Sequence, residues 1–157
     1  MVNTGDDAPD FSAPVANGDI EQFDLGERLD DAPIVLAFFP GAFTSVCTDE
    51  MCTFRDNLSD FEEVGAEVYG VSRDSPFTLN EFRAQNDLNF GLISDFNKEV
   101  IDAFDVEMDF ADLGVYGVAK RSVFVVDGDG DVTYSWVSDD PGVEPDYAEV
   151  ADAAAEA

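Results

Sequence analysis

The sequence contains no histidine, and only two of its 157 residues are cysteines. Without histidine, neither Ser-His-Asp nor Cys-His catalysis is available, and no histidine-bearing zinc or iron site can form. Two cysteines alone cannot hold a structural zinc ion or an iron–sulfur cluster. The chemistry that remains for the two cysteines is redox or thiolate chemistry.

Long apolar runs are absent as well. No run approaches the ~20 apolar residues that a bilayer-spanning helix needs. Residues 1–11 show neither the basic n-region nor the apolar h-region of a secretion signal. We therefore expect a cytoplasmic protein. In that compartment a cysteine pair is more often catalytic or redox-active than structural.

Basic residues are scarce: seven lysines and arginines face 36 acidic residues, and the net charge is -29. No basic patch can be assembled, which argues against binding to nucleic acid or to an anionic membrane. The acidic residues are spread along the whole chain. A calcium store or a nucleic-acid mimic would use such charge, but a solvated surface suited to high salt needs no partner, since screening shrinks to ~3 Å at 1 M. We expect the latter, and hence a salt-loving source.

The order of the predicted elements is typical of an α/β protein with parallel strands in the middle and an antiparallel edge. It matches the thioredoxin-like fold, a mixed central sheet with flanking helices, in a single domain over residues 1–157. Strands are predicted around Phe11 and at 20–23, 33–39, 66–72 and 91–95, with a hairpin at 122–137; helices are predicted at 44–63, 75–85, 97–104 and 144–156.

The acidic segment "DGDGD" at 127–131 fits the first three ligand positions of an EF-hand calcium loop. The sixth position, however, is Val132 where glycine is required, and the twelfth is Ser138 where a bidentate glutamate is required. We therefore expect this segment to be the turn of the hairpin.

Cys47 follows a predicted buried strand, the break at Pro40 and Gly41, and Thr44, which is a good helix N-cap. With Thr44 as the cap, Cys47 lies in the first helical turn, where unpaired N–H groups and the helix dipole stabilise a thiolate. An apolar stripe runs along the same helix at spacings of four and three: Cys47, Met51, Phe54, Leu58 and Phe61. Cys47 should therefore face the protein interior. The alternative to a reactive thiolate is that Cys47 is only a small apolar residue of the core.

Cys52 lies five residues further along the predicted helix. Five helical residues advance ~7.5 Å and turn ~140°, so the two Cα atoms stand ~8–9 Å apart. A disulfide needs a Cα separation under ~7 Å. Either the two cysteines never pair, or the first helical turns unwind when they do.

The motif Pro40-x-x-x-Thr44-x-x-Cys47 resembles the peroxiredoxin signature, in which a proline, a threonine and the peroxidatic cysteine line the peroxide pocket. The segments "GAFTSVCTDE", residues 68–100 and "RSVFVVDGDGDVTYSW" are similar to peroxiredoxins in order and spacing, and the similarity covers about residues 6–150. Cys47 and Cys52 resemble the bacterioferritin-comigratory (Q) type. The "AFT" and "DSPF" segments resemble the one-cysteine type similar to alkyl hydroperoxide reductase E.

This resemblance implies a thiol peroxidase for hydrogen peroxide or organic hydroperoxides, with no metal or organic cofactor. It implies that Cys47 becomes a sulfenic acid, that Cys52 resolves it, and that a thioredoxin-like or other thiol reductant restores the dithiol. Arg121 corresponds to the family's active-site arginine, and Glu50 to an acid that orients such arginines. Arg55 is the second candidate for a cation near the thiolate. Peroxiredoxins of this kind are often homodimers, although no feature of the sequence measures the oligomeric state.

Three other functions stay open at this point. The first is a one-cysteine peroxidase in which an external thiol resolves Cys47 and Cys52 takes no part. The second is a non-catalytic redox sensor that signals through helix unwinding. The third is an acidic binding module for calcium. For Arg121, the alternative to a role in the site is an ion pair on the surface with one of the many acidic residues.

Overall fold

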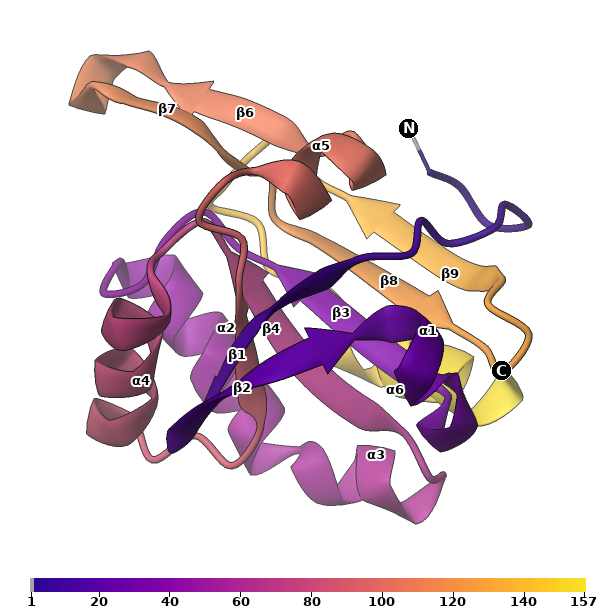
Figure 1. Ribbon diagram of the computed structural model, residues 1–157. Coiled ribbons are helices and arrows are strands. Elements are labelled where there is room, and N and C mark those ends of the chain that lie inside the picture. Colours follow the sequence, from indigo (N-terminus) through magenta and orange to yellow (C-terminus); the bar gives the residue numbers. More distant parts are fainter. Residues whose placement is uncertain (1) are drawn as a thin grey trace.

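A mixed sheet of seven strands forms the centre of the computed structural model, which describes residues 2–157 (Figure 1). The strand order is β2-β1-β5-β4-β3-β8-β9, in which β3, β4 and β5 are parallel and the outer pairs are antiparallel. The strands are β1 (Ser12–Asn17), β2 (Asp19–Asp24), β3 (Ile34–Phe38), β4 (Glu67–Ser72), β5 (Gly91–Ser94), β8 (Ser122–Val126) and β9 (Val132–Val137). This is the expected thioredoxin-like arrangement.

Helices cover both faces of the sheet. The helices are α1 (Leu25–Arg28), α2 (Ser45–Asp56), α3 (Leu58–Glu63), α4 (Pro76–Gln85), α5 (Glu99–Phe104) and α6 (Tyr147–Glu156). Buried side chains of α2, α3, α4 and α6 pack on one face, and those of α1 and α5 on the other. Strand β3 serves both layers: Val35 and Ala37 lie in the first core, and Leu36 lies in the second. This alternation explains why residues 33–39 are apolar throughout.

The predicted helix over residues 44–63 is wrong in one respect, because the structure divides it into α2 and α3 at Asn57. The Asn57 backbone leaves helical geometry at φ −105 and ψ 9, while its side-chain amide donates to the Thr53 carbonyl at 3.0 Å. Asparagine side chains compete with the backbone for such hydrogen bonds and so weaken helix interiors. The apolar stripe is nevertheless confirmed, since all five of its residues are buried in one core.

Two strands were not predicted. β6 (Glu107–Phe110) and β7 (Val115–Ala119) pair with each other, outside the central sheet, and a 3-10 turn at Ala111–Leu113 joins them. Figure 1 shows this hairpin projecting from the body of the protein. β6 does alternate acidic and apolar residues, with Met108 and Phe110 on one face, but the alternation covers only four residues, and a glycine interrupts β7. The strand signal was therefore too short to be recognised in the sequence.

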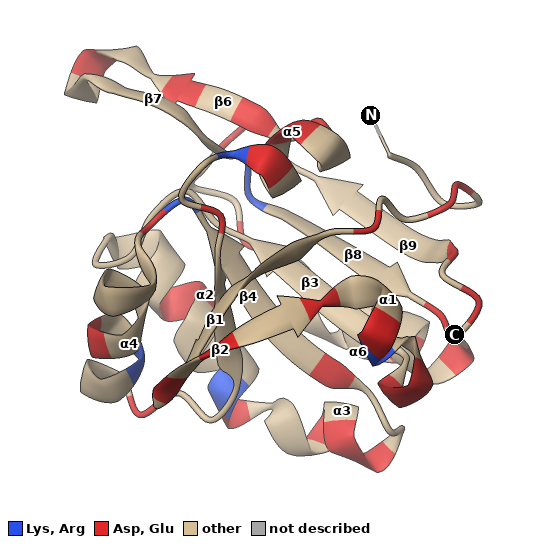
Figure 2. Cartoon of the chain, viewed as in Figure 1, with Lys and Arg blue, Asp and Glu red and all other residues tan. Residues whose placement is uncertain are grey.

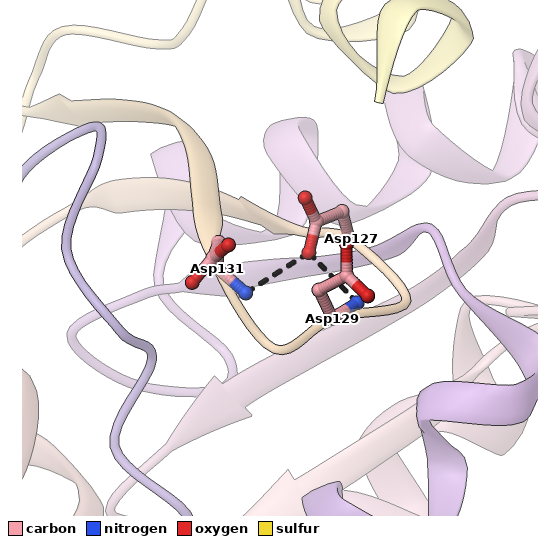
Figure 3. A group of neighbouring side chains, drawn as sticks. All are labelled: Asp127, Asp129 and Asp131. Carbon is pink, nitrogen blue, oxygen red and sulfur yellow. Dashed lines mark hydrogen bonds between the residues drawn. The ribbon is translucent and has the colours of Figure 1, made fainter.

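The acidic segment at 127–131 is the turn between β8 and β9, as expected. Carboxylate oxygens of Asp127, Asp129 and Asp131 lie within 4.8 Å of one another (Figure 3). One oxygen of Asp127 accepts the backbone N–H groups of Asp129 and Asp131 at 3.0 and 2.9 Å. Aspartate side chains in turns commonly accept hydrogen bonds from the backbone N–H groups that follow them. Stabilising the turn therefore explains the presence of Asp127 at this position.

Acidic residues are distributed along the chain over the helices, the connecting loops and strands β2, β4 and β6, and the few basic residues are scattered among them (Figure 2). This dispersed pattern agrees with a charged, solvated surface rather than with an acidic tail. No helix within residues 2–157 is both long enough and apolar enough to span a bilayer.

Candidate active site

Cys47 lies in the first turn of α2, at the carboxyl end of β3, as the sequence predicts. Its side chain is 1% exposed and belongs to the core on the α2 face of the sheet. Thr44 is the N-cap residue, but its hydroxyl does not cap the helix; it donates to the Gly41 carbonyl at 2.9 Å. The Thr44 side chain therefore accepts no hydrogen bond from the first N–H groups of α2. These N–H groups belong to the same helical turn as Cys47.

The loop between β3 and α2 is held in a strained conformation. Phe43 has a φ of 67°, a region that residues with a Cβ atom rarely adopt. Asp74 accepts the N–H of Ala42 at 2.8 Å, and the Phe43 ring packs edge-on against Phe82 at 5.3 Å between centroids. Such strain, of order 1–3 kcal/mol, persists only where the surroundings impose it. These contacts fix the loop that precedes Cys47.

Arg121 brings the predicted site residues together. Its Nη2 donates to Cys47 Sγ at 3.2 Å, and its Nη1 donates to Glu50 Oε1 at 2.8 Å. Both Nε and Nη2 also donate to the Pro141 carbonyl, at 3.1 and 3.0 Å. Arg121 is 1% exposed and Glu50 is 0% exposed. The alternative of a surface ion pair is thus wrong, because the pair is buried next to the thiol.

Burial raises the pKa of Glu50 to about 8, while the attraction and the hydrogen bond of Arg121 act in the opposite direction. Within the described residues, Glu50 Oε2 has no hydrogen-bond partner, which adds to the cost of ionising this carboxyl. The Arg121 guanidinium therefore lies between two acidic groups, the Glu50 carboxyl and the Cys47 thiol, and donates to both.

A pocket of about 550 Å³ opens onto Cys47. Pro40, Thr44 and Arg121 line it together with the thiol, so all residues of the sequence motif meet in one cavity. Pro40 is buried, and Arg121 lies just before β8, as expected. The pocket is also lined by residues outside the motif: Gly41, Ser45, Val46, Arg73, Asp74, Phe110, Leu113, Val115, Tyr116, Val118, Pro141 and Gly142.

Cys52 lies apart from this pocket. Its Sγ donates to the Asn86 side-chain oxygen at 3.9 Å, and both cysteines are free thiols. Because α2 is continuous from Ser45 to Asp56, the ~8–9 Å Cα separation expected for five helical residues applies. Arg55 does not reach Cys47; it donates to the Asn86 carbonyl at 2.6 Å and pairs with Asp56 at 3.0 Å. Of the two candidate cations, only Arg121 contacts Cys47.

Sequence reasoning missed three contributors to the site. The Pro141 carbonyl orients the Arg121 guanidinium, but a backbone acceptor leaves no trace in residue type. Asp74 anchors the loop before α2. Arg73 also lines the pocket. The sequence offered one indication of it: the chain has only seven basic residues, and one of them directly follows a predicted buried strand.

Comparisons with known proteins agree with this geometry. Residues 4–135 match the model of the AhpC/TSA family. A putative peroxiredoxin of Mycobacterium tuberculosis is 40% identical over 134 residues, which cover 83% of this chain and 82% of that protein. Peroxiredoxin Bcp of Escherichia coli K12 is 34% identical over 138 residues, or 85% of this chain and 84% of its own.

The crystal structure of peroxidoxin BcpB from Mycobacterium tuberculosis superposes with a TM-score of 0.83 at 32% identity, covering 99% of this chain and 97% of that one. The likeness therefore extends over nearly the whole chain. The chain belongs to the AhpC/TSA family and is a peroxiredoxin, an oxidoreductase of the thiol peroxidase class.

Proposed function

We propose that Cys47 is the nucleophile that reduces hydrogen peroxide or organic hydroperoxides. The observation that carries this proposal is the 3.2 Å contact between Arg121 Nη2 and the thiol at the base of the pocket. The thiolate attacks one peroxide oxygen, so that an S–O bond forms as the O–O bond breaks. The leaving oxygen takes up a proton and departs as water or an alcohol. Peroxide consumption by the protein and by its Cys47→Ser variant tests the assignment.

The residues around Cys47 have separate roles in this proposal. Arg121 stabilises both the thiolate and the negative charge that develops on the leaving oxygen. The Thr44 hydroxyl gives its hydrogen to the Gly41 carbonyl, so its lone pairs can accept from the O–H group of the peroxide. Glu50 positions Arg121, and Pro40 shields the base of the pocket from water. No metal or organic cofactor takes part.

We propose that Cys52 resolves the sulfenic acid within the same chain, as in the Q type. The Cys52 thiolate attacks the Cys47 sulfur, an S–S bond forms and water leaves. Because the two thiols face different surroundings on an intact helix, the first turns of α2 have to unwind before the bond can close. A thioredoxin-like or other thiol reductant then restores both thiols. A cytoplasmic location and a homodimer stay predictions.

Cys52→Ser is expected to leave the first peroxide reaction intact but to stop turnover with a disulfide reductant, because no disulfide can form. Small thiols should still support turnover, since they reduce the sulfenic acid directly. The measurement compares peroxide consumption with each reductant, and peptide mapping of the oxidised wild-type protein looks for a Cys47–Cys52 bond. Unchanged turnover with the disulfide reductant would instead favour the one-cysteine peroxidase, in which Cys52 takes no part.

We further propose that the surface is adapted to high salt. With a net charge of -29, repulsion between carboxylates destabilises the folded state in dilute buffer, and salt screens it. The melting temperature should rise by about 10 °C or more between dilute buffer and molar KCl. Sucrose is the matched control, because it stabilises through exclusion without screening charge. Full stability in dilute buffer would contradict the proposal.

A further inference from the structure

The β6–β7 hairpin presents apolar side chains to the mouth of the active-site pocket. Five of its residues line the pocket: Phe110, Leu113, Val115, Tyr116 and Val118. Leu113 is 75% exposed and Tyr116 is 59% exposed, so neither is needed to fill a core. The acidic residues of the hairpin, Glu107, Asp109 and Asp112, do not line the pocket; Glu107 binds Lys98 at 2.9 Å, and Asp109 accepts the Gly117 N–H at 2.8 Å.

The pocket is far larger than hydrogen peroxide requires. Its volume is about 550 Å³, whereas one water-sized molecule occupies ~30 Å³. Cavities of several hundred Å³ are the size that encloses organic ligands. The pocket lies between the loop that precedes Cys47 and the β6–β7 hairpin. The apolar side chains of the hairpin offer no hydrogen bond to a small polar peroxide.

Arg73 ties the hairpin to the body of the protein. Its Nη1 donates to the Tyr116 and Gly117 carbonyls at 2.9 and 3.2 Å. Gly117 has a φ of +68°, and a Cβ atom there would lie 2.9 Å from that nitrogen, so glycine permits the approach. The next residue, Asp74, holds the loop before α2 through Ala42. Two adjacent residues after β4 therefore fix both walls of the pocket.

The net charge of the chain also bears on the charge of the substrate that it binds. A net charge of -29 repels anionic molecules from the surface. Inside the pocket, Arg121 donates to Glu50, Pro141 and Cys47, and Arg73 Nη1 donates to the hairpin backbone, so contacts within the protein hold both arginines in place. A neutral hydroperoxide with an apolar group matches these surroundings better than an anionic one.

We infer that the β6–β7 hairpin is a substrate-binding wall that makes the site selective for neutral, apolar organic hydroperoxides over hydrogen peroxide. Arg73 is the residue that positions this wall. The apolar group rests against the hairpin and brings the O–O bond to Cys47, where the reaction proceeds as proposed above. The inference rests on the proposed function of Cys47, which supplies the chemistry.

The test compares kcat/KM for cumene hydroperoxide with kcat/KM for hydrogen peroxide. The wild-type ratio should exceed one. In the double variant Leu113→Ser/Tyr116→Ser the ratio should fall about ten-fold, the size typical of lost apolar contacts in a binding pocket. Arg73→Ala should lower the ratio through a higher KM for cumene hydroperoxide, and Arg73→Lys should restore part of it, because one ammonium still donates to a carbonyl.

Ile20→Ser is the matched control: Ile20 is also an exposed apolar residue, at 42%, but it lies on β2, away from the pocket. Its ratio should equal that of the wild type. A wild-type ratio below one, an unchanged ratio in both the hairpin and Arg73 variants, or an equal fall in Ile20→Ser would overturn the inference. Loss of activity toward both peroxides in Cys47→Ser tests the proposed function separately.

Discussion

Cys47→Ser is expected to lower the rate constant for peroxide consumption by at least about 10³-fold, a loss of the size seen when a nucleophile is removed. A serine hydroxyl stays protonated near neutral pH and cannot accept an oxygen atom from the peroxide, as the cysteine thiolate does when it becomes a sulfenic acid. Serine has nearly the shape of cysteine, so the buried site beneath Arg121 should remain packed. Stopped-flow peroxide consumption measures the loss, and a thermal melt checks the fold.

Cys52→Ser is the matched control, because it removes the other thiol of the same helix without touching the pocket. In a single turnover, this variant should react with peroxide as fast as the wild type. Equal losses in the two variants would mean that the chemistry does not reside at Cys47. Undiminished consumption by Cys47→Ser would end the peroxidase assignment for this residue.

Arg121→Gln is expected to slow the oxidation of Cys47 by about 10²–10³-fold, the usual effect of removing one preorganised donor to a developing charge. Glutamine can donate to the sulfur but carries no charge to stabilise a thiolate. Arg121→Lys should lose less, since it keeps the charge but cannot contact Cys47, Glu50 and the Pro141 carbonyl together. The readout is the rate of the first peroxide reaction in single turnover.

Arg55→Gln provides the comparison for Arg121, because Arg55 lies near the carboxyl end of α2 and donates to the Asn86 carbonyl, not to Cys47. Its effect on the first reaction should be small. A loss in Arg55→Gln as large as that in Arg121→Gln would show a general effect of charge in this acidic chain. The specific contact between Arg121 and the sulfur would then not explain the rate.

Much of the fold follows from the sequence because its buried elements are strongly patterned. The apolar run at 33–39 became β3, and Ser75 with Pro76 began α4 as expected, with the Ser75 hydroxyl accepting the Thr78 N–H. The break at Asn57 was missed because it depends on a local side-chain hydrogen bond, and the β6–β7 hairpin was missed because the alternation on β6 spans only four residues. The hairpin in particular is tied down by Arg73, which lies more than forty residues away in sequence.

Some residues of the candidate site could likewise be predicted from the sequence, and others could not. Pro40, Thr44 and Cys47 stand close together in sequence, so one loop and one helix start bring them together. Arg121 required the family resemblance, because it lies 71 positions after Glu50 in the sequence and meets it only in the folded chain. The Pro141 carbonyl was beyond sequence reasoning, since any residue type supplies such an acceptor.

The most direct test identifies the residue that receives the peroxide oxygen. Cys52→Ser protein is treated with one equivalent of peroxide, the sulfenic acid is trapped with dimedone, and peptide mass mapping locates the adduct. The account predicts a single adduct on Cys47, formed at the rate at which peroxide disappears. Peroxide that disappears while Cys47 remains an unmodified thiol, or an adduct on another residue, would contradict it.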